Sequence, residues 1–182
     1  MKKKLTMVVS LLLVMALSIG GTLAYLTDKT DTVKNTFTLG KVDITLIETT
    51  GETYQMVPGQ PIAKNPTVTV LKDSEACWLF VKIEENNVTN YLEYEVDTAW
   101  SKLEGVTGVY YKAIDSKVTA ENGESFAVLA DNQVTVKGSV TNELMDAAAQ
   151  NAPTLTFTAY AIQKTGFDSA AAAWSELTNP TV

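Results

Sequence analysis

The sequence contains no histidine, and this absence limits the chemistry the protein can perform. Catalytic zinc is usually held by imidazole nitrogens with carboxylates, and serine or cysteine nucleophiles usually need an imidazole base. The chain also lacks a Gly-x-Ser-x-Gly elbow and both standard forms of glycine-rich phosphate loop. A serine–lysine dyad stays open. We therefore expect no enzyme, no cofactor, and no catalytic, cofactor-binding or metal-binding residue.

Cysteine and arginine are also scarce. Cys77 is the single cysteine, so no disulfide bond can form within the chain, and arginine is absent altogether. Cys77 lies in an apolar run over residues 76–81, which favours a buried thiol that packs as a small hydrophobic group. A reactive or intermolecular thiol is the alternative.

The N-terminal residues have the order of regions found in a secretory signal peptide. Lysines at positions 2–4 precede an apolar run over residues 5–19, which is shorter than the roughly 20 residues of a membrane-spanning helix. A glycine pair then interrupts any helix, and small residues stand at −3 and −1 from a peptidase site. We predict cleavage between Ala24 and Tyr25; a retained anchor is the alternative.

Cleavage there divides the chain into a signal peptide over residues 1–24 and one domain over residues 25–182. The domain would be secreted, to the extracellular space or the cell surface, and would meet a signal peptidase during export. It would carry 11 lysines against 21 acidic residues, a net charge of −10. Such a surface repels nucleic acid and anionic lipid, so we expect no nucleic-acid partner and membrane contact only through an uncleaved signal peptide.

Short β-prone runs dominate the predicted domain. Alternation of apolar and polar residues, or apolar character on both faces, predicts strands over residues 35–48, 67–71, 77–83, 106–114, 125–129, 133–136 and 155–162. The run at 77–83 is apolar on both faces, so we expect a central strand covered on two sides. The fold class is thus mostly β: a two-sheet antiparallel sandwich, jelly-roll-like, with one or two short helices.

Helical patterns are confined to two places near the C-terminus. Residues 142–150 are rich in alanine, and Asp168 can cap a helix over residues 169–177 with an apolar stripe at helical spacing. Residues 91–103 are ambiguous between a strand and a helical turn. Proline and glycine at 58 and 59 indicate a type II turn over residues 57–60.

Two groups of side chains invite a functional interpretation. Glu93, Glu95 and Asp97 alternate with apolar residues and would project from one face of a strand. They form either a weak calcium site or a face that is simply solvated, and the sequence leaves both interpretations open. The aromatic residues are either a carbohydrate platform or the core of the sandwich, and their alternation within strands favours the core. They are Trp78, Phe80, Tyr110, Tyr111, Phe157, Tyr160 and Trp174.

The leader and the first strand together form a distinctive pattern. Gly20-Gly21-Thr22-Leu23-Ala24-Tyr25-Leu26-Thr27-Asp28 leads through Asn35-Thr36-Phe37 to Gly40-Lys41-Val42-Asp43-Ile44. This pattern resembles exported proteins with a SipW-type signal peptide from Gram-positive bacteria, the group of TasA-type biofilm matrix fibre proteins and camelysin. The resemblance implies a secreted jelly-roll-type domain of the cell envelope or biofilm matrix; some relatives form fibres, and others carry a metallopeptidase label.

Residues 25–36 are polar and β-permissive, and cleavage would free them after export. We predict a flexible segment that can add as a strand to a sheet edge of another copy, with Thr32, Val33 and Phe37 as candidate assembly residues; a disordered tail is the alternative. Our leading hypothesis is a structural component of the cell surface or biofilm matrix that forms a homo-oligomer or fibre. A camelysin-like metalloendopeptidase and a monomeric surface adhesion module are the alternatives.

Overall fold

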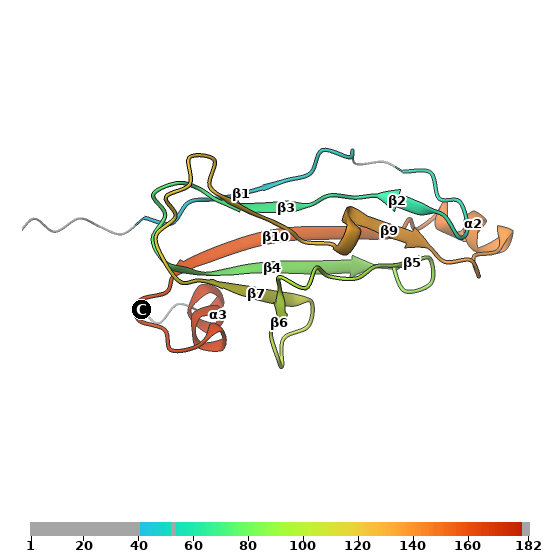
Figure 1. Cartoon of the computed structure of the whole chain (residues 1–182). Helices are drawn as coiled ribbons and strands as arrows, with labels where there is room; N and C mark the ends of the chain where they lie inside the picture. The colour runs from blue at the N-terminus through green and yellow to red at the C-terminus, as the bar shows by residue number, and fades with distance from the viewer. Residues whose placement is uncertain (1–40, 52–53, 180–182) are drawn as a thin grey trace, which may run out of the picture. The chain divides into compact units, whose positions relative to one another are not determined.

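A computed structural model of the chain describes residues 41–51 and 54–179, all within one compact unit, Leu39–Val182. The described part is mostly β, with ten strands in three antiparallel sheets and two α-helices, as Figure 1 shows. The strands are β1 (Ile44–Ile47), β2 (Pro61–Ala63), β3 (Thr67–Val70), β4 (Cys77–Asn86), β5 (Leu92–Glu93), β6 (Ser101–Lys102), β7 (Val109–Ile114), β8 (Glu124–Ala127), β9 (Gln133–Val136) and β10 (Thr154–Gln163).

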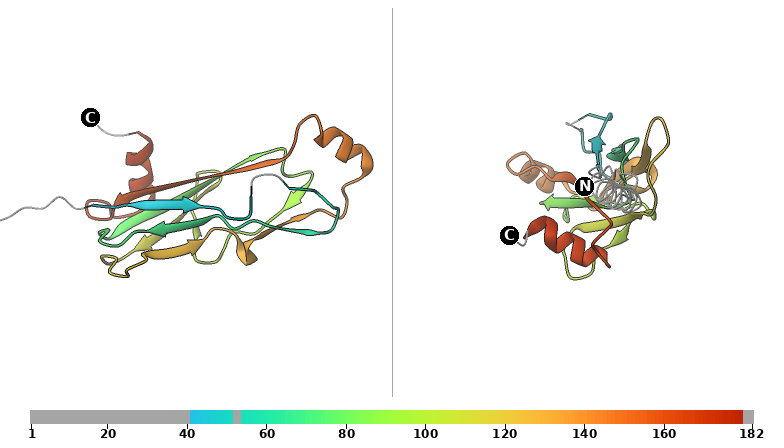
Figure 2. Two further views of the ribbon diagram at one scale, coloured as in Figure 1. Left: turned by 90° about the horizontal axis from the view of Figure 1, so that it is seen from above. Right: turned by 90° about the vertical axis from the view of Figure 1, so that its left-hand side faces the viewer.

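Two of the sheets pack face to face as a sandwich. One has the strand order β1-β3-β8 and the other β10-β4-β7-β6, and their facing side chains form one buried cluster. The third sheet, β2-β9-β5, continues the first: the Lys64 N–H donates to the Asn132 carbonyl at 2.8 Å, and the Val128 N–H to the Pro66 carbonyl at 2.9 Å. Figure 2 shows this layering from two further sides. The predicted mostly β, antiparallel sandwich is confirmed.

Strand β4 is central and covered on both faces, as its sequence predicts. Cys77, Leu79, Val81 and Ile83 point into the sandwich, where all four are buried. Trp78 and Phe80 project from the opposite face. Because alternate residues of a strand face opposite sides, apolar character at every position requires two separate apolar layers, and the second layer is supplied by a helix.

That helix is α3 (Ala170–Thr178), which lies on the outer face of the β10-β4-β7 sheet (Figure 1). The Trp174 ring lies 5.2 Å from Phe80 and 5.3 Å from Tyr160, centroid to centroid. Our expectation of the N-cap is wrong by one residue. Ser169, not Asp168, takes the extended cap conformation, and its hydroxyl accepts the Ala172 N–H at 3.2 Å.

The second helix, α2 (Asn142–Ala148), begins at the Thr141 cap and packs Leu144 and Ala148 against the β2-β9-β5 sheet. Within the described residues, neither helix is long and apolar enough to cross a bilayer. The ambiguous stretch 91–103 contains the two short strands β5 and β6 joined by turns, and no helix. The turn at 57–60 is as predicted: Gly59 has a φ of +74°, and the Gln60 N–H donates to the Val57 carbonyl at 3.0 Å.

Candidate functional site

The residues that the sequence singles out for processing and assembly lie outside the described part of the structure. They are the cleavage pair Ala24 and Tyr25 and the candidate assembly residues Thr32, Val33 and Phe37. The signal peptide and the flexible segment over residues 25–36 lie outside it as well. These assignments stay predictions, and the site has to be sought in the domain that follows.

The three side chains of the acidic row do not all face the same way. Glu93 and Glu95 are exposed and line one shallow hollow, whereas the Asp97 carboxylate turns back to accept the Ala99 N–H at 2.8 Å. Across residues 41–51 and 54–179, no three acidic or cysteine side chains come close enough together to hold a metal ion. Glu93 and Glu95 therefore lie as acidic residues do on a strand face that is open to solvent.

The aromatic residues predicted for the core do pack there. Trp78, Phe80, Tyr111, Tyr160 and Trp174 form the cluster beneath α3, while Tyr110 and Phe157 pack against the interior of the sandwich. Cys77 is fully buried beside them. Burial, with a smaller contribution from the charge of Glu124, raises the pKa of the Cys77 thiol to about 11, which makes it a packing group and a poor nucleophile.

One edge of the sandwich combines unpaired backbone with incompletely covered apolar side chains. β10 pairs with β4 along its full length of ten residues, and no described strand lies on its other side. The Lys164 N–H donates to the Ala76 carbonyl at 2.8 Å, so in this register the even-numbered residues of β10 direct their N–H and C=O groups at β4. The odd-numbered residues, Leu155 to Gln163, direct theirs away from the sheet.

Among the described strands β1 pairs only with β3, so it offers a second unpaired edge next to the first. The Leu71 N–H donates to the Asp43 carbonyl at 2.9 Å, which turns the odd-numbered residues of β1 toward β3. The backbone groups of Ile44 and Leu46 therefore face away from β3. β1 contacts β10 although the two strands belong to opposite layers.

We call this edge the β1–β10 seam and define it by the inward-facing side chains Val42, Ile44, Leu46, Leu155, Phe157, Ala159 and Ala161. All seven pack against the core but remain partly exposed, whereas Val68 and Val70 on β3 and Val81 on β4 are fully buried. The difference follows from topology, because an inner strand has a neighbour on each side and an edge strand has only one. An additional strand along the seam would complete both the hydrogen bonding and the apolar cover.

A polar cluster lies next to the seam and contacts it through Phe157. The Lys64 Nζ lies 2.9 Å from both carboxylate oxygens of Glu48, and sits 5.3 Å from the Tyr54 ring centroid and 5.4 Å from that of Phe157. The Tyr54 hydroxyl donates to Glu48 at 2.7 Å. Burial raises the pKa of Glu48, but hydrogen bonds from Lys64, Tyr54 and Thr50 together lower it by more. The pKa of Glu48 is therefore below its usual value. We call this group the Glu48 cluster.

Sequence reasoning identified β1 and β10 as strands but missed that they are edges. It also missed the Glu48 cluster entirely, since its members are separated by 6 and 16 residues in the sequence. The alternation within a strand reports which face is buried and is silent on the neighbours that flank it. The sequence therefore carried no signal for either edge.

Comparison with known proteins gives one match. The sequence model of the family described as camelysin metallo-endopeptidase matches residues 1–71, which run from the N-terminus to the end of β3. No curated protein and no solved structure matches the chain. The match supports the likeness to camelysin that the leader and first strand suggest, and it covers less than half of the sequence. The match does not extend to β4 or to the elements after it.

Proposed function

We propose that this protein is a secreted structural component of the cell surface or biofilm matrix, and that it self-assembles by β-strand addition. The observation that carries the proposal is the β1–β10 seam. It presents outward-facing backbone groups on two neighbouring strands above apolar side chains that the domain leaves partly exposed. Exposed edges of this kind are normally shortened, charged or covered in proteins that remain monomeric.

The donor in this proposal is the segment over residues 25–36, extending to Phe37, of a neighbouring copy. Its threonines and Val33 favour an extended conformation, and cleavage after Ala24 would release it from the leader. Addition to the seam would gain backbone hydrogen bonds and bury apolar surface at roughly 25 cal/mol per Å². Since the donor and the seam are different surfaces of one chain, repeating the contact gives an open filament.

The decisive test removes the outward N–H of one residue in β10. Ala159→Pro leaves the β4–β10 hydrogen bonds in place, because the Ala159 N–H points away from β4. We expect a folded monomer that forms no filaments in negative-stain electron microscopy. Ala159→Ser keeps the N–H and should assemble as the unchanged chain does. Normal filaments from Ala159→Pro would refute addition at β10.

Deleting residues 25–36 tests the other partner in the contact. The shortened chain should keep its thermal unfolding midpoint and lose concentration-dependent growth in light scattering. Adding a synthetic peptide of residues 25–37 in excess should block assembly of the complete protein by occupying the seam. Unchanged filament growth in both experiments would leave the seam without a role and favour a monomeric surface adhesion module.

The family match favours a second candidate, a metallo-endopeptidase. The absence of histidine from the whole sequence speaks against it, because one cysteine and carboxylates alone suit zinc poorly. A peptidase would degrade casein in a chelator-sensitive manner. We expect no such activity from the purified protein, and reproducible, chelator-sensitive cleavage would establish this second candidate.

A further inference from the structure

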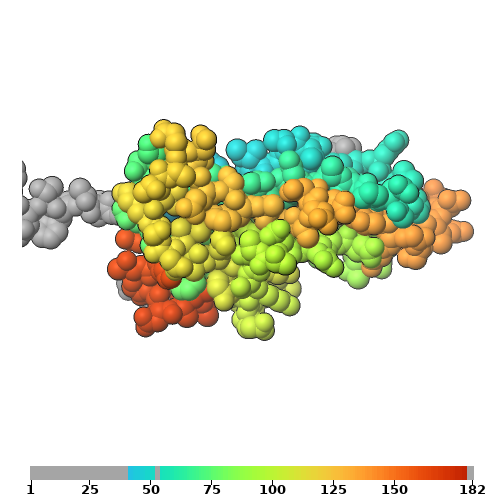
Figure 3. All heavy atoms as spheres, in the orientation of Figure 1, coloured from blue at the N-terminus to red at the C-terminus, as the bar shows by residue number. Residues whose placement is uncertain are grey.

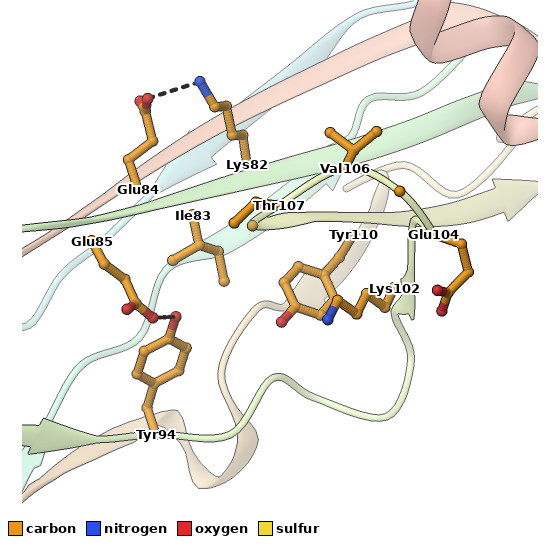
Figure 4. A pocket seen from close by; sticks show the side chains of 12 residues that line it. Lys82, Ile83, Glu84, Glu85, Tyr94, Lys102, Glu104, Val106, Thr107 and Tyr110 are labelled. Atoms are coloured by element: carbon orange, nitrogen blue, oxygen red, sulfur yellow. Dashed lines mark hydrogen bonds and ion pairs between the residues drawn. The ribbon is translucent and has the colours of Figure 1, made fainter. Parts of the chain in front are cut away.

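A groove lies on the side of the sandwich that carries β5 and β6. It has a volume of about 860 Å³ and is walled by the end of β4, the turn from β6 to β7, and Tyr94. Figure 4 shows it from close by, and Figure 3 shows the β6–β7 segment projecting from the surface. The turn requires glycine at position 108. The φ of Gly108 is +71°, and a Cβ there would stand 2.3 Å from the Ile83 carbonyl oxygen.

A second hollow adjoins the groove at Tyr94. It has a volume of about 340 Å³, shares Glu85, Tyr94 and Tyr110 with the groove, and is also lined by β5 residues and Lys137. The volume of the groove itself, about 860 Å³, lies within the roughly 300–1,000 Å³ of ligand pockets in general.

Some of the polar groups in the groove are already engaged. The Lys82 ammonium pairs with Glu84 at 2.8 Å, and the Tyr94 hydroxyl donates to Glu85 at 2.5 Å, as the dashed lines in Figure 4 mark. The Tyr94–Glu85 bond fixes one wall, because it ties the segment after β5 to the end of β4. Burial and this bond to Glu85 raise the pKa of Tyr94 and keep its hydroxyl protonated as a donor.

Other polar groups in the groove are unengaged. Within the described residues, Lys102, Glu104 and the Tyr110 hydroxyl form no side-chain hydrogen bond or ion pair. They offer, in turn, a donor, an acceptor and a group that does both. Figure 4 shows Lys102 and Tyr110 side by side on the same wall. The groove thus presents free donors and acceptors beside two partly buried tyrosine side chains.

We infer that this groove binds a neutral oligosaccharide chain. Each sugar hydroxyl both donates and accepts, which matches a free ammonium beside a free carboxylate. The parts of the two tyrosine rings that remain exposed can contact the apolar face of a sugar. Charged polymers fit less well. The lining carries nearly balanced charge, and the surrounding acidic protein repels anionic chains. The site is separate from the β1–β10 seam and does not depend on self-assembly.

Titration of the isotope-labelled full chain with a panel of neutral linear hexasaccharides tests this inference. The panel contains β-1,4-glucose, β-1,3-glucose, α-1,6-glucose and β-1,4-N-acetylglucosamine hexamers. We expect at least one to shift the amide NMR signals of residues 82–85 and 102–110 in a saturable way. No response to any of the four, or shifts confined to other regions, would overturn the inference.

Substitutions at exposed positions identify the contacts without disturbing the fold. Lys102→Ala and Glu104→Gln should each weaken the binding hexasaccharide about tenfold, the scale of one hydrogen bond to a charged group. Lys117→Ala removes an exposed lysine of the loop after β7, outside the groove, and should leave the affinity unchanged. Equal affinity in all three variants, or tighter binding of an acidic or basic hexapeptide than of every sugar, would refute the assignment.

Discussion

At the scale of single residues, Glu48 links the stability of the fold to pH. Its pKa in the folded protein lies below the usual value of a glutamate, because hydrogen bonds from Lys64, Tyr54 and Thr50 outweigh the effect of burial. A lowered folded pKa means that the folded state favours the ionised form. The stabilisation is therefore present above the unfolded-state pKa, near 4.3, and is lost as the pH falls through the lower folded pKa.

Replacing Glu48 with glutamine should remove this pH dependence. At pH 7 we expect Glu48→Gln to lower the free energy of unfolding by about 1–3 kcal/mol, because the largely buried Lys64 ammonium loses its charge partner. The difference from the unchanged protein should shrink as the pH falls toward 3, measured by urea unfolding at each pH. Glu121→Gln, which breaks an exposed ion pair with Lys72, should change little at any pH. A constant deficit across the pH range would contradict this account.

Cys77 gives a second prediction at this scale. With its thiol fully buried and its pKa raised to about 11, only about one molecule in a thousand carries the thiolate at pH 8. The folded protein should therefore resist Ellman's reagent for hours and react within minutes in 6 M guanidinium chloride, as absorbance at 412 nm would show. Rapid modification of the folded chain would mean that β4 opens readily or that the thiol is accessible.

At the scale of elements, α3 covers the outer face of the central sheet through one tryptophan. Trp174→Ala removes the ring that packs on Phe80 and Tyr160, and should cost about 3–5 kcal/mol in the free energy of unfolding. Ser175→Ala changes an exposed neighbour in the same helix and should lie within about 0.5 kcal/mol of the unchanged protein. A small effect of Trp174→Ala in urea unfolding would show that α3 contributes little to the fold.

The N-cap of α3 is a second point at which sequence and structure differ, because the sequence favours Asp168 and the structure has Ser169. The Ser169 hydroxyl accepts the Ala172 N–H, whereas Asp168 lies one position before the cap. Ser169→Ala should destabilise the protein by about 1 kcal/mol, and Asp168→Ala by clearly less. Both values can be read from thermal unfolding by circular dichroism. The reverse order would restore the interpretation that the sequence first favours.

The strands show where prediction from sequence ends. β4, β9 and β10 are long or regular enough for their alternation to be recognised, and each was predicted within a few residues. β2, β5 and β6 are two or three residues long, too short for a period of two to repeat. Pairing order is set by contacts between distant parts of the chain, so the open edge of β10 could not be predicted. The groove could not either, because it joins Lys82, Tyr94 and Lys102 from three separate segments.

At the scale of the whole molecule, the two candidate surfaces differ in chemistry. The β1–β10 seam offers unpaired backbone over apolar side chains, and the groove offers paired and unpaired charges beside tyrosine rings. One suits a strand of the same protein and the other suits a polymer of different chemistry. A protein that used both could join copies of itself into filaments and bind those filaments to a surrounding polysaccharide.

Net charge sets the conditions under which such filaments would grow. Cleavage at the predicted site would leave a domain with a net charge of −10, which repels its own copies, and 0.15 M salt screens this repulsion beyond about 8 Å. We expect filament growth, followed by light scattering, to be slow in 10 mM salt and faster in 150 mM salt. Asp146→Lys, at an exposed position of α2, changes the net charge from −10 to −8 and should accelerate growth in low salt while changing little in high salt. If growth slowed with added salt, attraction between opposite charges would be driving assembly. That result would contradict strand addition between copies that repel one another.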